Sequence, residues 1–151
     1  MKKRLTHEEK FGSRLSSKGL FNYAQTFYNS FSELVRIDSH TTRFHPVQYY
    51  LASHSIELAL KSLLRELGFT YDQLMNLGHD LEKILRKVQE KDGMEFTDQE
   101  VAVIKDLNVY YRVKQLEYFI QSYKEFPDLL ITEMVVLSLL SQTEARVMVR
   151  K

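Results

Sequence analysis

The sequence predicts an all-α protein, a bundle of four to five helices in up-and-down order. Glycine and proline are scarce, with five and two residues among 151, whereas the helix-favouring residues Leu, Glu, Lys and Gln are common. Apolar residues recur at intervals of three and four over long stretches, which is the period of a helix. No stretch of any length alternates between apolar and polar residues, as a half-buried strand would. Helices with short connections mostly run antiparallel to their neighbours.

The first two helices have clear boundaries. One runs from about residue 18 to 36, with apolar residues at helical spacing. The next begins at Pro46, a favoured first residue, and ends before Gly68, a favoured residue just past a helix end. Thr70 and Gln73 have the spacing of a capping box, which predicts a short helical turn after it.

Two further helices fill the middle of the chain. Asp80 is an N-cap residue type, and it precedes a helix over about 80–91 that Gly93 follows. Thr97 to Glu100 form a second capping box and begin another helix. The residues expected to point inward from that helix are Val101, Ile104, Leu107 and Tyr111.

Pro127 restarts the helical pattern for a last helix over about 128–147. Leu130, Met134, Leu137 and Leu140 lie on one face of it. The length of 151 residues suits a single domain, 1–151, with one core. Within it we expect residues 1–16 to form an irregular basic tail.

The charge is unevenly distributed although the net charge is only +1. Residues 1–20 carry six Lys or Arg and two Glu, whereas residues 21–145 are acidic. We interpret the basic ends as solubilising tails, since a nucleic-acid-binding domain is usually more basic overall.

Composition also bears on the compartment. The chain has no cysteine, which excludes disulfides and thiolate chemistry. No apolar stretch follows the basic N-terminus as in a signal peptide. The longest apolar run, 129–140, is too short for a membrane span and contains Glu133. We therefore expect a cytoplasmic protein.

Ionisable residues interrupt the most apolar helix of the chain, in the stretch "SHSIELALK". At 100° per residue, His54, Glu57 and Lys61 form a stripe between two apolar faces. A solvated Glu–Lys pair four residues apart is one interpretation. The other is a semi-buried network, in which each group needs a partner, and "GHDL" offers His79 and Asp80.

We favour the network formed by His54, Glu57, Lys61, His79 and Asp80, with a structural role rather than a catalytic one. It predicts that His79 or Asp80 lies within hydrogen-bonding reach of the Glu57–Lys61 stripe.

Metal chemistry has little support in the sequence. His54 and Glu57 could put two ligands on one helix face. Di-iron bundles, however, use two Glu-x-x-His copies and two further Glu, and this chain has one reversed copy. No phosphate-cradling glycine motif and no nucleophile elbow occurs. We expect no metal and no cofactor.

A second candidate site lies in the tyrosine-rich segment "LNVYYRVKQLEYF". Its residues are Asn108, Tyr111, Arg112, Lys114 and Tyr118. Cations interleaved with tyrosines suit phosphate pairing and base stacking. Alternatively, the tyrosines edge the core and the cations are solvated. The sequence leaves both interpretations open.

Three segments, "YYLASHSIELALKSLLRELG", "GHDLEKIL" and "LNVYYRVKQLEYF", resemble the HEPN superfamily of helical domains. The resemblance spans about residues 46–119, and the matching positions are Glu57, Lys61, His79, Asp80, Leu81 and Tyr111. It implies a four- to five-helix bundle that commonly forms a homodimer. Many members are ribonucleases of toxin–antitoxin, CRISPR or abortive-infection systems, while others partner a small nucleotidyltransferase or bind nucleotides.

The chain departs from the ribonuclease members at one point. In those members an Arg is followed by a His after four to six residues, and both act in a composite site between protomers. Here Arg112 is followed by no His, and Arg36 and His40 are separated by only three residues. The resemblance therefore implies the fold more than the ribonuclease activity.

Three hypotheses follow. The leading one is a non-catalytic or weakly catalytic module that binds RNA or nucleotides in a defence or toxin–antitoxin system, as a homodimer. The second is a diverged metal-independent ribonuclease, with His79 or His54 as base and Arg112 as phosphate clamp. The third is an interaction bundle that partners a nucleotidyltransferase through Phe21, Tyr28 and the last helix.

Overall fold

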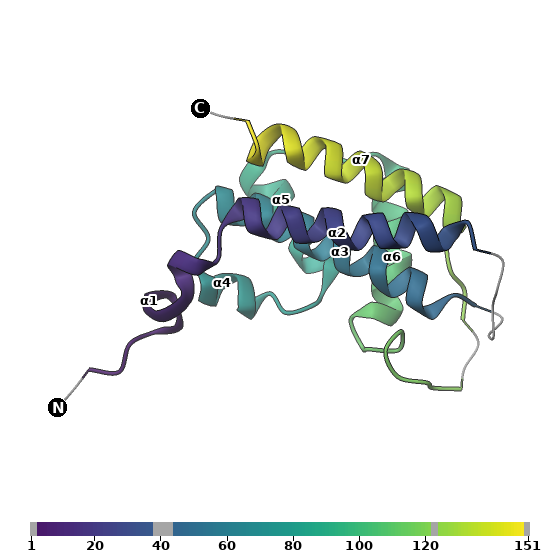
Figure 1. Cartoon of the computed structure of the whole chain (residues 1–151), viewed down its shortest axis with the longest axis horizontal. Helices are drawn as coiled ribbons and strands as arrows, with labels where there is room; N and C mark the ends of the chain where they lie inside the picture. The colour runs from purple at the N-terminus through teal and green to yellow at the C-terminus, as the bar shows by residue number, and fades with distance from the viewer. Residues whose placement is uncertain (1–2, 38–43, 122–123, 150–151) are drawn as a thin grey trace.

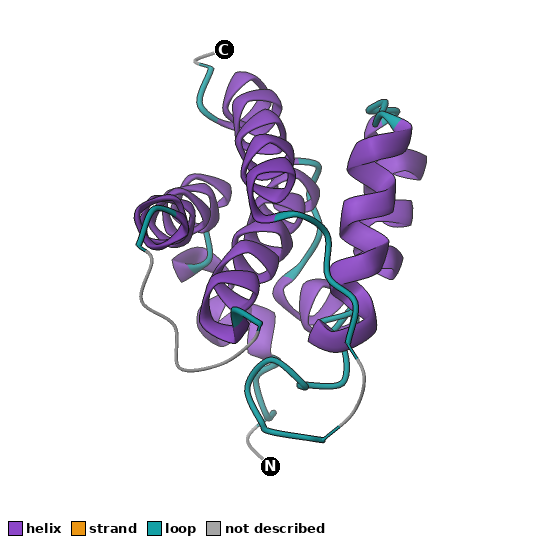
Figure 2. Cartoon of the chain, turned by 90° about the vertical axis from the view of Figure 1, so that its right-hand side faces the viewer, coloured by secondary structure: helices purple, strands orange, loops and turns teal. Residues whose placement is uncertain are grey.

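The computed structural model describes residues 3–37, 44–121 and 124–149. Over these ranges the chain forms seven α-helices and one 3-10 turn, without any strand (Figures 1 and 2). The prediction of an all-α bundle is confirmed. None of the helices in these ranges combines the length and apolar composition that a membrane span needs. His40 lies outside the described residues.

Helix α3 (Pro46–Glu66) is the centre of the bundle. It packs against α2 (Ser17–Val35), α5 (Leu81–Asp92), α6 (Asp98–Tyr111) and α7 (Leu129–Val147). In Figure 1, α2 and α3 run antiparallel and α7 lies beside α2. Fourteen residues of α3 are buried, so this helix is covered on most of its surface. Small residues permit the close approach, and Ser55 donates a hydrogen bond of 2.7 Å to the Ala24 carbonyl in α2.

The helix ends follow their local sequence signals. Thr70 and Thr97 both form complete capping boxes, at the starts of α4 (Tyr71–Asn76) and α6. Asp80 caps α5, since its side chain accepts a hydrogen bond from the Lys83 amide at 3.3 Å. Gly93 ends α5 with a φ of 69°, which a residue without Cβ adopts at little cost. Each of these boundaries was predicted.

The N-terminal segment differs from the prediction. An irregular tail over residues 1–16 is wrong for its second half, because His7–Phe11 form the short helix α1 and Gly12–Arg14 a 3-10 turn. Thr6 and Glu9 form a capping box at the start of α1. The same kind of capping box begins α4 and α6, so the sequence carries a signal for α1 as well.

Arg65 in α3 anchors this N-terminal segment. Its guanidinium donates to the carbonyls of Leu15 at 2.8 Å and Gly12 at 2.6 Å, and to the Glu8 carboxylate at 3.2 Å. Glu8 in turn accepts a bond of 2.6 Å from the Tyr71 amide, at the start of α4. That backbone hydrogen bond is the main reason why the pKa of Glu8 lies below its ordinary value, with Arg65 also lowering it. The segment is therefore part of the fold.

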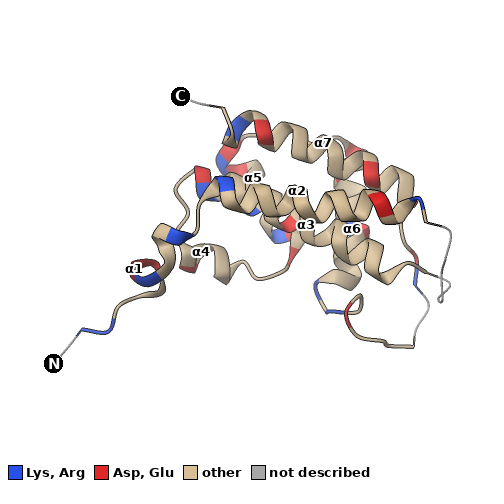
Figure 3. Cartoon of the chain, viewed as in Figure 1, with Lys and Arg blue, Asp and Glu red and all other residues tan. Residues whose placement is uncertain are grey.

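The last helix turns a different face inward from the one predicted. Leu140 is buried, but Leu130, Met134 and Leu137 are each more than half exposed. The buried residues are Thr132, Val135, Val136, Leu139, Leu140, Thr143 and Val147. Because α7 is apolar on several sides, its sequence does not indicate which side α2 and α3 cover. No charged residue occurs over 134–143, and the middle of α7 is uncharged in Figure 3.

The predicted interaction face on α2 is also wrong in part. Phe21 and Tyr28 are both buried in the core cluster. Because they are buried, they are not available to a partner protein.

Candidate functional site

The carboxylate of Glu57 is the centre of a buried polar cluster. It lies on α3, and its side chain is 4% exposed. One oxygen, Oε1, accepts from His79 Nδ1 at 2.6 Å and from the Tyr111 hydroxyl at 2.9 Å. The other, Oε2, accepts from Lys61 Nζ at 3.3 Å. The predicted contact between His79 and the Glu57–Lys61 stripe is confirmed.

The turn between α4 and α5 places the His79 ring beside Glu57 and the Gly78 carbonyl beside Lys61. Lys61 is 5% exposed and donates a second hydrogen bond, of 2.8 Å, to the Gly78 carbonyl. Gly78 has a φ of 60°, in the left-handed region that favours glycine. The Lys61 ammonium and the Glu57 carboxylate are therefore paired with each other, and each also hydrogen bonds to a group of the turn. Buried charges need such partners.

His54 joins the cluster through Tyr111. Its Nδ1 lies 2.9 Å from the Tyr111 hydroxyl. Burial raises the pKa of the Tyr111 phenol, and the charge of Glu57 raises it further, so the hydroxyl keeps its proton. Since that proton is donated to Glu57, the bond from His54 must be donated by an Nδ1–H. Burial lowers the pKa of His54, although Glu57 partly opposes this effect.

Two residues of the second candidate segment contact Asp80. The side chain of Asn108 accepts a bond of 2.8 Å from the Leu81 amide and donates one of 2.9 Å to Asp80. Arg112 Nη1 lies 3.9 Å from the other oxygen of Asp80. In the described part of the chain, Asp80 therefore does not contact the Glu57–Lys61 stripe. It pairs with Asn108 and Arg112 of the second candidate set, whereas Tyr111 of that set binds Glu57. The residues form two polar groups, one around Glu57 and one around Asp80, which are neighbours in the chain at His79–Asp80 and at Tyr111–Arg112.

Two predicted residues, Lys114 and Tyr118, join neither the Glu57 group nor the Asp80 group. Both are exposed, and within the described ranges neither side chain hydrogen bonds to either group. Lys114 has a φ of 61°, which is rare and costly for a residue with a side chain. Both Lys114 and Tyr118 lie in the turns that directly follow α6, so they are near Tyr111 and Arg112 in sequence.

The two polar groups reach the surface through His79 and Arg112, respectively. The His79 side chain is 55% exposed and the Arg112 side chain 57% exposed. The following turns expose Lys114, Tyr118 and Phe119. We use the name His79 surface for His79 and Arg112 together with these three exposed residues, which follow Arg112 in the chain. It combines a histidine on a buried carboxylate with two cations and two exposed aromatic rings.

Three neighbours of the cluster were not predicted. Tyr50 stacks on His54 with ring centroids 5.8 Å apart, and Phe27 meets the same ring edge-on at 4.5 Å. Burial is the main cause that raises the pKa of Tyr50, and the charge of Glu117 raises it further. Tyr50 precedes His54 by four residues, so it could have been found by extending the polar stripe one turn upstream.

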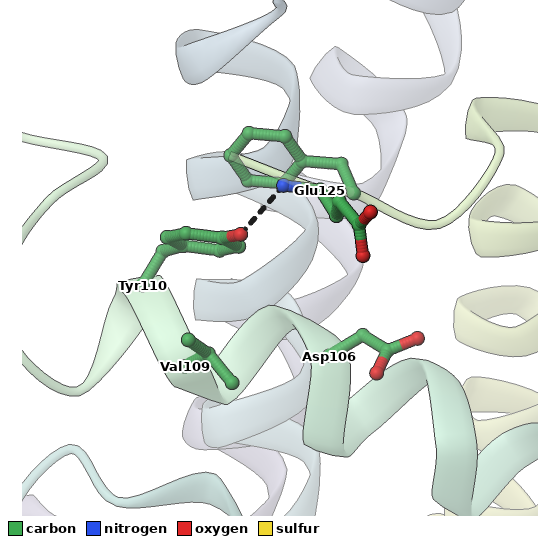
Figure 4. A pocket seen from close by; sticks show the side chains of 5 residues that line it. Asp106, Val109, Tyr110 and Glu125 are labelled. Atoms are coloured by element: carbon green, nitrogen blue, oxygen red, sulfur yellow. Dashed lines mark hydrogen bonds between the residues drawn. The ribbon is translucent and has the colours of Figure 1, made fainter. Parts of the chain in front are cut away.

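A separate cavity lies on the other side of α6. It measures about 420 Å³ and is lined by Asp106, Val109, Tyr110, Glu125 and Phe126 (Figure 4). The Glu125 amide donates a bond of 2.6 Å to the Tyr110 hydroxyl. With two carboxylates and no cation in its lining, this cavity is unsuited to a phosphate.

The described residues contain no group of three or more His, Asp or Glu that could hold a metal ion. Comparison of the chain with protein-family models, with curated proteins and with solved structures finds no match.

Proposed function

We propose that the chain binds RNA or a nucleotide through the His79 surface. The observation that carries this proposal is that His79 and Arg112 are both accessible, while each pairs with a carboxylate, His79 with Glu57 and Arg112 with Asp80, the residue next to His79. The resemblance to the HEPN superfamily supports the same ligand class, a cytoplasmic setting and a role in a defence or toxin–antitoxin system.

The physical basis is a fixed imidazole ring, His79, and a mobile guanidinium, Arg112. Glu57 holds the His79 ring in place, so binding costs little side-chain entropy there. Arg112 pairs with Asp80 only at 3.9 Å and in a solvent-accessible position, where such a pair is weak. Its guanidinium can therefore turn to a phosphate, which it pairs with bidentately. Exposed Tyr118 and Phe119 can stack on a base.

Fluorescence anisotropy with labelled single-stranded RNA, and competition with AMP, tests this proposal at low and moderate salt. We expect Arg112→Gln to weaken binding by about tenfold, as for loss of one phosphate contact. The matched control is Arg86→Gln, an exposed arginine on another face of α5. A folded protein that binds neither RNA nor AMP would contradict the proposal.

A second candidate is a metal-independent ribonuclease, and the Glu57–His79 pair favours it. A carboxylate on Nδ1 leaves Nε2 as the proton acceptor, as in other carboxylate–histidine pairs. His79 is better suited than His54, which is bound to Tyr111 and packed between aromatic rings. Nε2 would remove the proton of a ribose 2′-hydroxyl, which attacks the adjacent phosphorus, while water protonates the departing 5′-oxygen.

RNA cleavage in the presence of a chelator distinguishes this candidate. We expect His79→Asn to abolish cleavage and His7→Asn, at an exposed site, to leave it unchanged. If the wild-type protein leaves RNA intact, the ribonuclease candidate is wrong and the binding proposal stands alone.

We also propose that two copies of the chain associate through α7. Leu130, Met134 and Leu137 form an exposed apolar stripe. A twofold contact places the same patch opposite itself, and the uncharged stretch 134–143 meets no like charge there. The HEPN resemblance, which implies homodimers, supports the same partner.

A further inference from the structure

A groove between α4 and α5 carries three lysines in a row. It has a volume of about 370 Å³, and its lining includes Lys83, Lys87, Lys91, Phe69, Gln73 and Asn76. We call it the lysine groove. The lysines are four residues apart, so they line up along one side of α5. No acidic residue lines the groove.

The spacing of these lysines suits a chain of phosphates. At 1.5 Å per residue, Lys83 and Lys91 are about 12 Å apart along the helix. A stacked nucleic-acid strand has one phosphate about every 3.4 Å, so this length matches three or four nucleotides. Lys87 lies 3.5 Å from Glu90, but both side chains are exposed, and such pairs exchange readily for a phosphate.

The lining of the groove includes residues close to His79 in the chain, on both sides of it. Asn76 in its lining lies three residues before His79, and Lys83 lies one turn after the N-cap of α5, Asp80. The carboxylate of Asp80 is engaged by Asn108, besides its capping bond. These two bonds fix the Asp80 carboxylate at the start of α5.

We infer that the lysine groove binds the continuing strand of a single-stranded RNA whose first nucleotide occupies the His79 surface. Phe69, partly buried against the core, offers the exposed part of its ring for base stacking. The NH2 group of Gln73, whose oxygen caps α4, and the amide of Asn76 can hydrogen bond to base edges. These groups favour an open strand over a duplex, whose bases are already paired and stacked. The inference rests on the proposed RNA-binding function and adds to it a strand length and a path.

The test compares a dinucleotide with an octanucleotide of uridylate by fluorescence anisotropy over a range of salt concentrations. For the wild-type protein we expect at least tenfold tighter binding of the octamer. In the variant Lys83→Gln/Lys87→Gln/Lys91→Gln, this gain from length should disappear. The slope of log affinity against log salt for the octamer should also fall by about 2, since each phosphate contact contributes about 0.7 for a single strand.

The matched control is Lys10→Gln/Arg86→Gln/Lys105→Gln, which removes the same charge at exposed positions outside the groove. Thermal melts confirm that both variants fold. An equal loss in both would overturn the inference, because it would indicate nonspecific attraction. So would tighter binding of a duplex, or of a phosphorylated peptide, than of the octamer.

The two proposals fail differently. If the wild-type protein binds the dinucleotide but gains nothing from length, the lysine groove is wrong and the His79 surface stands. If it binds neither oligonucleotide, the proposed function fails and the inference with it.

Discussion

Glu57 accepts hydrogen bonds from three side chains, and removal of its carboxylate should leave Lys61 without its counter-charge. In Glu57→Ala the Lys61 ammonium, 5% exposed, would keep only the Gly78 carbonyl as partner. We expect the free energy of unfolding to fall by roughly 3–5 kcal/mol, the cost of an unpaired buried charge. Urea denaturation measures it.

The double variant Glu57→Leu/Lys61→Met serves as the control, because it removes both charges together. It should lose less stability than Glu57→Ala alone. A loss below about 1 kcal/mol in Glu57→Ala would show that water reaches Lys61 and that the cluster does not stabilise the fold.

His54 should make the stability depend on pH. Burial lowers its folded-state pKa below the ordinary 6.5, while Glu57 and Glu117 raise it and His79 and Lys61 lower it further. Between the two values the unfolded chain binds more protons, so the stability contribution is full above pH 6.5 and falls as the pH drops below it.

Denaturation curves between pH 7.5 and 5.5 measure this effect. We expect His54→Gln to lose less stability over that interval than the wild-type protein does. His7→Gln, at an exposed position, should follow the wild-type curve. A His54→Gln curve parallel to the wild type would show that the pKa of His54 is the same folded and unfolded.

At the scale of elements, Arg65 decides whether the N-terminal segment is attached. Its fork reaches the carbonyls of Gly12 and Leu15 together, which a lysine cannot reproduce. We expect both Arg65→Ala and Arg65→Lys to expose residues 3–16 to limited proteolysis, with α2 to α7 remaining resistant. Mass spectrometry of the fragments identifies the cut sites. Cleavage at the same rate in Arg65→Lys and wild type would mean that charge alone holds the segment.

The elements also show what the sequence could predict. The helix boundaries at Pro46, Thr70, Asp80 and Thr97 were predictable because capping is decided by a few neighbouring residues. The inward face of α7 was not, because an apolar helix gives no contrast between its sides. Several contacts between residues far apart in the sequence were not predicted either.

The polar residues include contacts that the sequence predicted and contacts that it did not. His79 was predicted as a partner of Glu57, since buried charges need partners and one turn of the sequence offered them. The contacts that join Asn108 and Arg112 to Asp80 were not predicted, because they depend on the angle at which α6 meets α5. The attachment of residues 7–14 depends on Arg65, fifty residues beyond Leu15.

For the whole molecule, the exposed stripe on α7 makes oligomeric state a measurable consequence. We expect the wild-type chain to sediment as a dimer and Leu137→Lys to sediment as a monomer, since a twofold contact would bring two new charges together. Leu5→Lys is the control, as Leu5 is also exposed but lies far from α7 in sequence. A monomeric wild-type protein at micromolar concentration would contradict the dimer.

One oxygen of Glu57 serves both a side chain of the core, Tyr111, and a side chain at the surface, His79. A ligand on the outer face of His79 binds only the folded chain, in which Glu57 holds the ring, so it raises the melting temperature. A ligand present at a hundred times its dissociation constant adds about 2.7 kcal/mol to the folded state. A thermal-shift screen of RNAs, nucleotides and other phosphate esters could therefore identify the natural ligand without an assay designed for any one of them.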